Sequence, residues 1–311
     1  MVTETAVRCD DLVKDYGLLR ALDGIALEIA AGEFFALLGP NGAGKSTLIN
    51  ILAGLTRPTS GRAAILGCDV RQQWRRARER LGVVPQELAY DPFFTVREML
   101  LLQSGYFGLG RENRPWLEEL LAALGLEDKA DTTMNHLSGG MKRRALIAQA
   151  LVHRPPVVIL DEPTAGVDVA LRRRLWDFIG SLNQRGHTII LTTHYLEEAE
   201  AMCRRIAILK QGRLVALADR DELLSQSRQR RLRLRLEKGV RVEPVDLPPA
   251  LYDKLEPAPA GELQLLLDRE ADPLGGVLAA LADSGVYFTD LKIEEPGLTE
   301  VYSRLTGADG V

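Results

Sequence analysis

The run Gly39-Pro40-Asn41-Gly42-Ala43-Gly44-Lys45-Ser46-Thr47 constrains the fold more than any other part of the chain. It follows the short apolar segment 34–38 and precedes residues 46–55, whose apolar spacing is that of a helix. Glycines at this spacing let the backbone curl, so that several N–H groups and the N-terminus of the helix face one anion. Between a strand and a helix, the pattern predicts a phosphate-binding loop rather than a glycine-rich surface turn.

The last residues of this loop indicate what kind of phosphate it binds. Lys45 is expected to reach the β- and γ-phosphates of a nucleotide, and the Ser46 hydroxyl is expected to ligate Mg²⁺. We therefore predict a nucleoside triphosphate and Mg²⁺ as the ligands of residues 39–47.

Two carboxylates, Asp161 and Glu162, end the aliphatic run 157–160. Because buried unpaired carboxylates are costly, this pair must be solvated or must bind a cation. Asp161 fits a water-mediated place around Mg²⁺, and Glu162 fits the general base that activates a water. The alternative is an acidic turn at the surface.

Three further side chains are expected near the same site. His194 and Gln86 each follow a predicted strand, and open parallel sheets gather their ligands at the carboxyl ends of strands. His194 is expected to contact the γ-phosphate and to hold the attacking water and Glu162 in place, and Gln86 to touch Mg²⁺ or water. Tyr16 is expected to stack on an adenine. In isolation each of these residue types is more typical of packing or of the surface.

A second candidate phosphate site is formed by Ser138, Gly139 and Gly140, which precede a helix predicted from Met141 onward. In isolation the serine would be an ordinary helix N-cap. Because the first loop already accounts for one nucleotide, the surplus turn predicts that Ser138 and Gly140 cover the nucleotide of a second copy of the chain.

The order of predicted elements indicates an α/β fold with a mostly parallel sheet covered on both faces. Helices are predicted at 96–103, 115–124 and 141–152 within an insert at about 87–150. Strands at 157–160, 187–192 and 206–209 alternate with helices at 170–184 and 195–203. The composition changes near residue 225, which predicts a main domain at 1–224 and a small α+β domain at 225–311. The latter has strands at 232–236, 262–268 and 286–293 and a helix at 274–284.

Composition limits the cellular setting. The net charge of −4 argues against a general nucleic-acid binder, and the three scattered cysteines form neither a metal pattern nor a disulfide framework. We see no signal peptide and no apolar run of the length that spans a bilayer, so a cytoplasmic protein is predicted. The arginine clusters at 71–80 and 228–235 are expected to be solvated faces, with contact to a membrane surface or a membrane protein as the alternative.

Taken in order, these motifs resemble those of the ATP-binding cassette (ABC) ATPases. Over residues 6–220, Tyr16 resembles the adenine-stacking aromatic residue of the family and His194 its switch histidine. The other matches are to Walker A at 39–47, the Q-loop at Gln86, the signature at 137–141, Walker B at 157–162 and the D-loop ending at Asp168. The signature departs from the family pattern at Met141, where the family has Gln.

The resemblance implies a P-loop NTPase fold with a RecA-like parallel core, an antiparallel β subdomain and a helical signature subdomain. It implies an ATPase that uses ATP and Mg²⁺. Two copies, or this chain and a paralogous subunit, would sandwich the nucleotides between them, with Gly139 and Asp168 joining Ser138 and Gly140 at the shared sites. The other partner would be an integral membrane permease, which would hold the chain at the cytoplasmic face of the membrane.

Several stretches are similar to exporter subunits in particular, among them Ser-Gly-Gly-Met-Lys-Arg-Arg at 138–144 and the terminal segment 298–307. These subunits pair with permeases of the group that exports drugs, polysaccharides and lipids. An importer ATPase is the alternative within transport. An ABC protein that acts on DNA or ribosomes is disfavoured, because the chain has one cassette and too short an insert for a long coiled coil.

Overall fold

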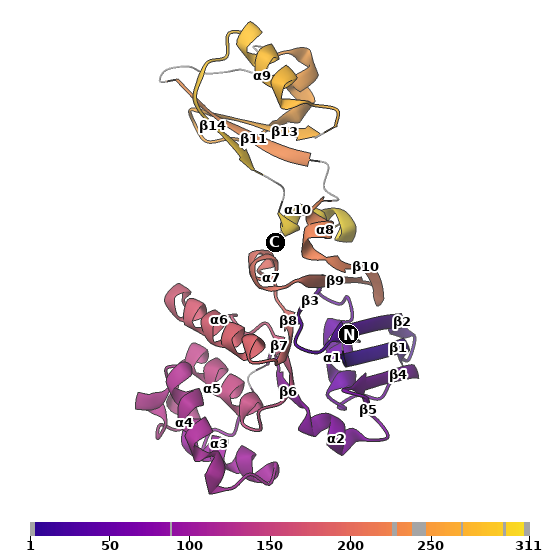
Figure 1. Ribbon diagram of the computed structural model, residues 1–311, viewed down its shortest axis with the longest axis vertical. Coiled ribbons are helices and arrows are strands. Elements are labelled where there is room, and N and C mark those ends of the chain that lie inside the picture. Colours follow the sequence, from indigo (N-terminus) through magenta and orange to yellow (C-terminus); the bar gives the residue numbers. More distant parts are fainter. Residues whose placement is uncertain are drawn as a thin grey trace. The chain divides into compact units, whose positions relative to one another are not determined.

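A computed structural model describes residues 4–87, 89–225, 229–237, 247–268, 270–294 and 297–307. The chain divides after Arg220 into two compact units, unit 1 and unit 2 (Figure 1). Unit 1 contains two sheets and unit 2 contains one, each unit has its own hydrophobic core, and each is described by itself below.

A six-stranded, mostly parallel sheet forms the centre of unit 1. Its strand order is β10-β9-β3-β8-β7-β6, and only β10 runs antiparallel to its neighbour. The strands are β3 (Phe34–Leu38), β6 (Leu81–Val84), β7 (Val157–Asp161), β8 (Thr188–Thr192), β9 (Arg205–Lys210) and β10 (Arg213–Asp219). The predicted parallel α/β sheet is confirmed, and β10 is an addition that a tight turn at Gln211 and Gly212 connects to β9.

Helices cover this sheet, as the buried apolar strands require. They are α1 (Lys45–Leu52), α6 (Val169–Gln184) and α7 (Leu196–Met202). In Figure 1, α1 lies between the central sheet and a second sheet, whereas α6 lies on the other side. Leu48 and Ile51 of α1 belong to one buried cluster with Phe35 of β3, and this cluster continues into the second sheet through Leu12. The loop that precedes α1 is thereby fixed between two sheets.

The second sheet of unit 1 is antiparallel, with the strand order β2-β1-β4-β5. Its strands are β1 (Thr5–Tyr16), β2 (Leu19–Ala30), β4 (Ser60–Ile65) and β5 (Cys68–Asp69), and the short helix α2 (Trp74–Glu79) follows. The sequence predicts strands within residues 6–38, which β1 and β2 confirm, but no pattern locates β4, β5 or α2. These three are short elements, and turns interrupt their periodicity.

The predicted helical insert contains α3 (Val96–Tyr106), α4 (Arg114–Ala123) and α5 (Gly139–Leu151), with short 3-10 turns between them. Helix α5 begins at Gly139 and not at Met141 as predicted, because the Ser138 hydroxyl accepts a hydrogen bond from the Met141 amide and caps the helix two residues earlier. No helix within the described residues is long and apolar enough to cross a membrane.

Unit 2 is a four-stranded antiparallel sheet with the order β12-β13-β11-β14. Its elements are α8 (Arg220–Ser225), β11 (Gln229–Leu236), η5 (Pro249–Lys254), β12 (Leu255–Glu256), β13 (Glu262–Asp268), α9 (Leu274–Asp283), β14 (Phe288–Glu294) and α10 (Leu298–Thr306). Leu232 and Leu234 of β11 are fully buried in one cluster with Val277 and Leu281 of α9. The alternation of leucine and arginine in β11 thus separates a core face from a charged face.

The charged face of β11 corrects the expectation of a solvated cluster at 228–235. Arg231 lies 2.5 Å from Glu256 and 3.4 Å from Glu300, and Arg233 lies 3.4 Å from Glu294. The carboxylates come from β14, beside β11, and from β12 and α10, so segments far apart in the sequence pair these arginines. Arg228, also in the predicted cluster, lies outside the described residues.

Candidate functional site

A cavity of about 370 Å³ opens at the carboxyl edge of the parallel sheet. Strand β3 lies beside β8, with β7 and β6 beyond, so the segments that leave these four strands meet at one edge. The residues that line the cavity are Tyr16, Leu19, Arg20, Ala21, Asn41, Gly42, Ala43, Gly44, Lys45, Ser46, Thr47, Gln86, Asp161, Glu162 and Gln211. The predicted loop and the predicted strand-end carboxylates therefore share one site.

The loop after β3 depends on two of its glycines. At Gly39 a Cβ would lie 2.5 Å from the carbonyl oxygen of Leu209, and at Gly44 a Cβ would lie 2.6 Å from that of Ala21. Gly44 also has a φ of 109° and precedes α1, whose N-terminus has no side-chain cap. The first-turn N–H groups of α1 lack acceptors within the helix, so they are available to an anion in the cavity.

Lys45 is held against the same loop. Its Nζ atom donates to the carbonyl oxygens of Gly39 at 2.5 Å and Pro40 at 3.2 Å, which curves the side chain back over the loop. Burial lowers the pKa of Lys45 from its ordinary value, and the charges of Asp161 and Glu162 oppose that shift. These contacts hold a cationic group against the loop, where Lys45 lines the cavity.

Glu162 is the centre of a group of three side chains. Nε2 of His194 lies 2.5 Å from Oε1 of Glu162, and Nε2 of Gln86 donates to Oε2 at 3.1 Å. The backbone of Glu162 has a φ of 52°, a left-handed conformation that costs a non-glycine residue about 1–3 kcal/mol. The strained turn after β7 aims this carboxylate at the side chains that follow β8 and β6.

Asp161, the neighbour of Glu162, is 7% exposed and accepts a hydrogen bond from the Thr192 hydroxyl on the adjacent strand. Ser46 lines the same cavity from the loop side. Within the described residues, no group of three or more His, Cys, Asp or Glu side chains is placed to hold a metal ion. Ser46 and Asp161 each offer side-chain oxygens to this part of the cavity.

Tyr16 lies at the cavity at the end of β1 and is 45% exposed. The Nζ atom of Lys14 lies 4.6 Å from the centre of its ring. The neighbouring residues Leu19, Arg20 and Ala21, and Gln211 from the β9–β10 turn, also line the cavity and were not predicted. No pattern in the sequence marks them, because they reach the site through strand pairing far from the loop.

The surplus turn does not line this cavity. Ser138 caps α5, and Asp168 caps α6 by accepting a hydrogen bond from the Leu171 amide at 3.0 Å. A Cβ at Gly140 would lie 3.5 Å from the carbonyl oxygen of Gly166, so the turn and the segment before Asp168 lie next to each other. At Gly139 a Cβ would meet nothing within 4 Å. The structure thus groups Ser138, Gly139, Gly140 and Asp168 apart from the loop of the same chain.

Arg143 connects this turn to Gln86, a link that the sequence analysis missed. Its guanidinium donates to the carbonyl oxygens of Pro85 at 2.7 Å and Gln86 at 2.6 Å. Burial lowers the pKa of Arg143, opposed by the charges of Glu162 and Asp161. One signal for this link was available in the sequence, since Arg143 is a charged residue on the apolar side of the helix predicted at 141–152.

Glu198 is a second residue that the sequence analysis missed. It is 9% exposed, and it accepts hydrogen bonds from the hydroxyls of Thr193 at 2.8 Å and Thr164 at 3.1 Å and from the indole of Trp176 at 3.2 Å. One buried carboxylate thereby joins the segment after Glu162, the residue before His194 and helix α6.

Comparisons with known proteins identify the family of this chain. The family model described as "ABC transporter" matches residues 22–165. The Nod factor export ATP-binding protein I of Paraburkholderia xenovorans is 37% identical over 98% of this chain and 98% of its own length. The protein of the same name from Burkholderia thailandensis is 48% identical over 65% of this chain and 67% of its own length.

Solved structures give the same result for the fold. The structure of an ATP-binding subunit of an ABC transporter has a TM-score of 0.68 at 31% identity, over 71% of this chain and 93% of that one. A dimeric ATP-binding cassette in a post-hydrolysis state with ADP and Pi has a TM-score of 0.64 at 29% identity, over 68% of this chain and 98% of that one. The chain therefore belongs to the ABC transporter family, as one of its ATP-binding, ATP-hydrolysing subunits.

Proposed function

We propose that the protein is the ATPase subunit of an exporter and works beneath a separate membrane permease. The observation that carries the export direction is the full-length match to a relative named for Nod factor export, which includes unit 2 as well as the cassette. The cargo would be selected by the permease, since the cavity described above is built for a nucleotide.

In this proposal the loop 39–47 holds the phosphates of ATP. The N–H groups at the start of α1 and the ammonium group of Lys45 bind the β- and γ-phosphate oxygens. The ring of Tyr16 stacks on the adenine with the face that Lys14 leaves open, because Lys14 packs over the ring. Arg20 also lines the cavity, where its guanidinium is paired with Asp15 at 2.9 Å and Asp23 at 3.1 Å.

Hydrolysis is assigned to Glu162 as the general base. His194 and Gln86 each bind one of its carboxylate oxygens, so they fix the orientation of the group that accepts the proton of the attacking water. A positioned base of this kind contributes a factor of about 10²–10⁴ in rate. His194 also contacts the γ-phosphate in this proposal, which aligns water, base and phosphate.

The donors around the loop fit Mg²⁺. Ser46 offers a hydroxyl oxygen, Gln86 an amide oxygen and Asp161 a carboxylate that Thr192 orients. Hard oxygen donors of this kind suit Mg²⁺, which is commonly held by one or two side chains together with phosphates and water. When bound, the ion would neutralise charge on the phosphates, while these three side chains orient it.

A second cassette completes the site in this proposal. Ser138, Gly139, Gly140 and Asp168 lie apart from the loop of their own chain, and a related cassette was solved as a dimer with ADP and Pi. The partner is a second copy or a paralogous subunit whose signature turn covers the γ-phosphate. ATP drives closure because it binds the closed dimer more tightly than the open one.

Coupling to the permease is assigned to the helical insert. Arg143 binds the backbone of Gln86, so a shift of Gln86 on nucleotide binding is transmitted directly to α5. A permease helix docked on the insert would then move with it. The protein would therefore lie at the cytoplasmic face of the membrane, with no part of the nucleotide site in the bilayer.

The test is to isolate the complex from detergent-solubilised membranes through a tag on this subunit. We expect one co-purifying integral membrane protein and ATP-dependent movement of its cargo out of the cytoplasmic compartment, measured in inverted vesicles. Recovery with ribosomes or DNA, or movement of the cargo in the opposite direction, would contradict the proposal.

A further inference from the structure

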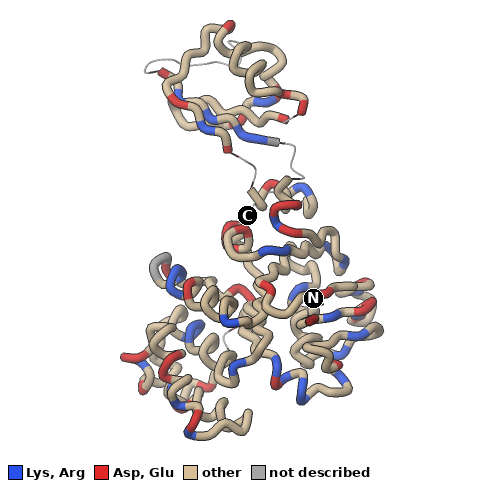
Figure 2. Tube along the Cα trace, viewed as in Figure 1, with Lys and Arg blue, Asp and Glu red and all other residues tan. Residues whose placement is uncertain are grey.

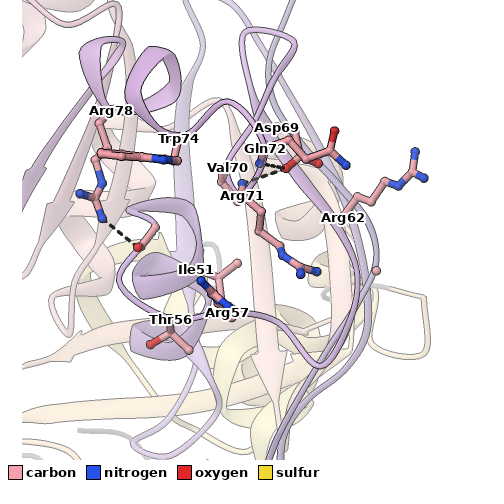
Figure 3. Close-up of a pocket in the computed structure, with 12 residues that line it drawn as sticks. Ile51, Thr56, Arg57, Arg62, Asp69, Val70, Arg71, Gln72, Trp74 and Arg78 are labelled. Carbon is pink, nitrogen blue, oxygen red and sulfur yellow. Dashed lines mark hydrogen bonds between the residues drawn. The ribbon is translucent and has the colours of Figure 1, made fainter.

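Four arginines from separate segments of unit 1 surround a hollow of about 650 Å³, away from the nucleotide cavity. Arg57 follows α1, Arg62 lies on β4, Arg71 follows β5, and Arg78 lies on α2. Figure 3 shows the side chains of Arg57 and Arg71 extending into this hollow, with Ile51 beside them. We call the set formed by Arg57, Arg62 and Arg71 the arginine triad.

The local charge around the hollow is strongly positive although the chain as a whole is acidic. Seven arginines and two carboxylates lie between residues 57 and 80, whereas the net charge of the chain is −4. Figure 2 shows Lys and Arg along α2 and the neighbouring turns. Like charges gathered in this way favour the binding of an anion.

Two carboxylates lie near these arginines: Asp69 lines the hollow itself, and Asp10 lies on β1. Oδ1 of Asp69 accepts hydrogen bonds from the backbone amides of Arg71 at 2.8 Å and Gln72 at 2.9 Å, which fixes it in a turn. Asp10 faces Arg62 across the β1–β4 ladder but pairs with Arg8 at 2.9 Å. Among the described residues, the three guanidiniums of the arginine triad form no ion pair.

Arg78 is not counted in the triad, because its guanidinium is already hydrogen-bonded to backbone carbonyl oxygens. It donates to the carbonyl oxygens of Ala53 at 3.2 Å and Gly54 at 2.8 Å, at the C-terminal end of α1. Its guanidinium lies 5.2 Å from the centre of the Trp74 ring, and Arg75 lies 4.2 Å from the same ring. Arg78 therefore neutralises the negative end of the helix and builds one wall of the hollow.

We propose that the arginine triad binds a phosphate group. Guanidinium forks match the tetrahedral oxygens of phosphate and bind them through pairs of parallel hydrogen bonds. Two forks, those of Arg57 and Arg71, extend into the hollow from separate segments, and Arg62 lines it from a third. Several guanidiniums around one hollow suit a group with several oxygens better than an isolated peptide carboxylate. The group belongs either to an anionic phospholipid headgroup or to a soluble phosphate compound, and the two sources share this chemistry.

The test compares the protein with a triple variant, Arg57→Gln, Arg62→Gln and Arg71→Gln. A matched control removes three exposed arginines elsewhere, by the substitutions Arg111→Gln, Arg114→Gln and Arg235→Gln. None of the six side chains lines the nucleotide cavity, so ATP hydrolysis by the purified subunit should be unchanged in both variants.

One arm measures flotation with vesicles of phosphatidylcholine and phosphatidylglycerol against vesicles of phosphatidylcholine alone. The other arm titrates inorganic pyrophosphate by calorimetry with the nucleotide site saturated with ADP. Binding in the first arm identifies a headgroup, and binding only in the second identifies a soluble phosphate. In either case the triple variant should bind at least about tenfold more weakly than the control, because several charge-assisted hydrogen bonds are lost.

The proposal is overturned if the protein binds neither probe, or if the triple variant binds like the control. If neither probe binds and the triple variant also fails to assemble with the permease, the triad serves a contact with an acidic protein surface instead. Added salt should weaken the binding, because exposed charges are screened.

Discussion

Nε2 of His194 lies 2.5 Å from Oε1 of Glu162, which joins the residues that follow two adjacent parallel strands, β8 and β7. Gln86, after β6, donates to the other oxygen of the same carboxylate. The candidate base follows β7, and residues that follow the strands on either side, β8 and β6, contact its two carboxylate oxygens. Its geometry follows from strand order, and the substitutions below test that geometry.

Replacing Glu162 with Gln should leave ATP binding intact and slow hydrolysis by about 10²–10⁴-fold, because an amide cannot accept the proton of the water. The variant should also accumulate as a dimer in the presence of ATP. Phosphate release and size-exclusion chromatography measure the two effects. The control is Glu87→Gln, which changes an exposed glutamate next to Gln86 in the sequence. Near-normal turnover of the Glu162 variant would remove the base assignment.

A mixture of Ser138→Arg chains with Lys45→Ala chains tests whether the sites are shared. Each variant alone should be inactive, because every site in its homodimer lacks either the lysine or the serine turn. In the mixture, each heterodimer regains one site with both groups intact. ATPase activity should therefore reappear on mixing, measured as phosphate release. If mixing restores no activity, each site is built within one chain.

Arg143→Met should lower the rate of hydrolysis by about tenfold while nucleotide affinity stays near normal. The loss of two charge-assisted hydrogen bonds, worth about 1.5–3 kcal/mol each, frees the backbone of Gln86 from α5. Steady-state kinetics and calorimetry separate the two effects, and Lys142→Met is the control. Equal losses in affinity and rate would point to unfolding of the segment rather than to positioning.

Glu198→Gln should slow hydrolysis without weakening ATP binding, since the carboxylate holds Thr193, next to His194, and Thr164, close to Glu162. A glutamine presents an N–H group to one of these donors, which leaves a buried group unsatisfied at a cost of about 1–3 kcal/mol. Glu197→Gln, at an exposed position of the same helix, is the matched control. Unaltered turnover in the Glu198 variant would show that the network does not position His194.

Unit 1 should lose stability below neutral pH because of His153. Burial lowers the pKa of this histidine to about 4, and its Nε2 lies 3.2 Å from the carbonyl oxygen of Leu81. Below the ordinary pKa of 6.5 the unfolded chain binds a proton that the folded chain does not, so the free energy of unfolding falls as the pH drops from 7 toward 4. The expected loss from this residue is about 2 kcal/mol at pH 5.

Tryptophan fluorescence follows this loss in urea, because Trp74, Trp116 and Trp176 all belong to unit 1. His153→Gln should flatten the pH dependence, and His136→Gln, at an exposed position, should leave it unchanged. The same pH dependence in the His153 variant as in the unaltered protein would exclude this histidine as the cause.

The sequence by itself determined the chemistry-bearing segments and the parallel α/β class. A phosphate loop, a strand-end carboxylate pair and alternating strands and helices are local patterns, set by backbone freedom at glycine and by the period of apolar residues. The helix cap at Ser138, which the sequence offered as the alternative for the surplus turn, is local too, and the structure shows it. That the turn covers the nucleotide of a second copy stays a prediction.

Only the tertiary structure decided which distant residues meet. The strand order β3-β8-β7-β6 brings Lys45, His194, Glu162 and Gln86 to one edge, and no local pattern encodes that order. The buried links through Arg143 and Glu198, the lining residue Gln211 and the arginine triad likewise depend on long-range packing. A charged side chain looks the same in a sequence whether it is solvated or buried, because its surroundings are set by segments far away along the chain.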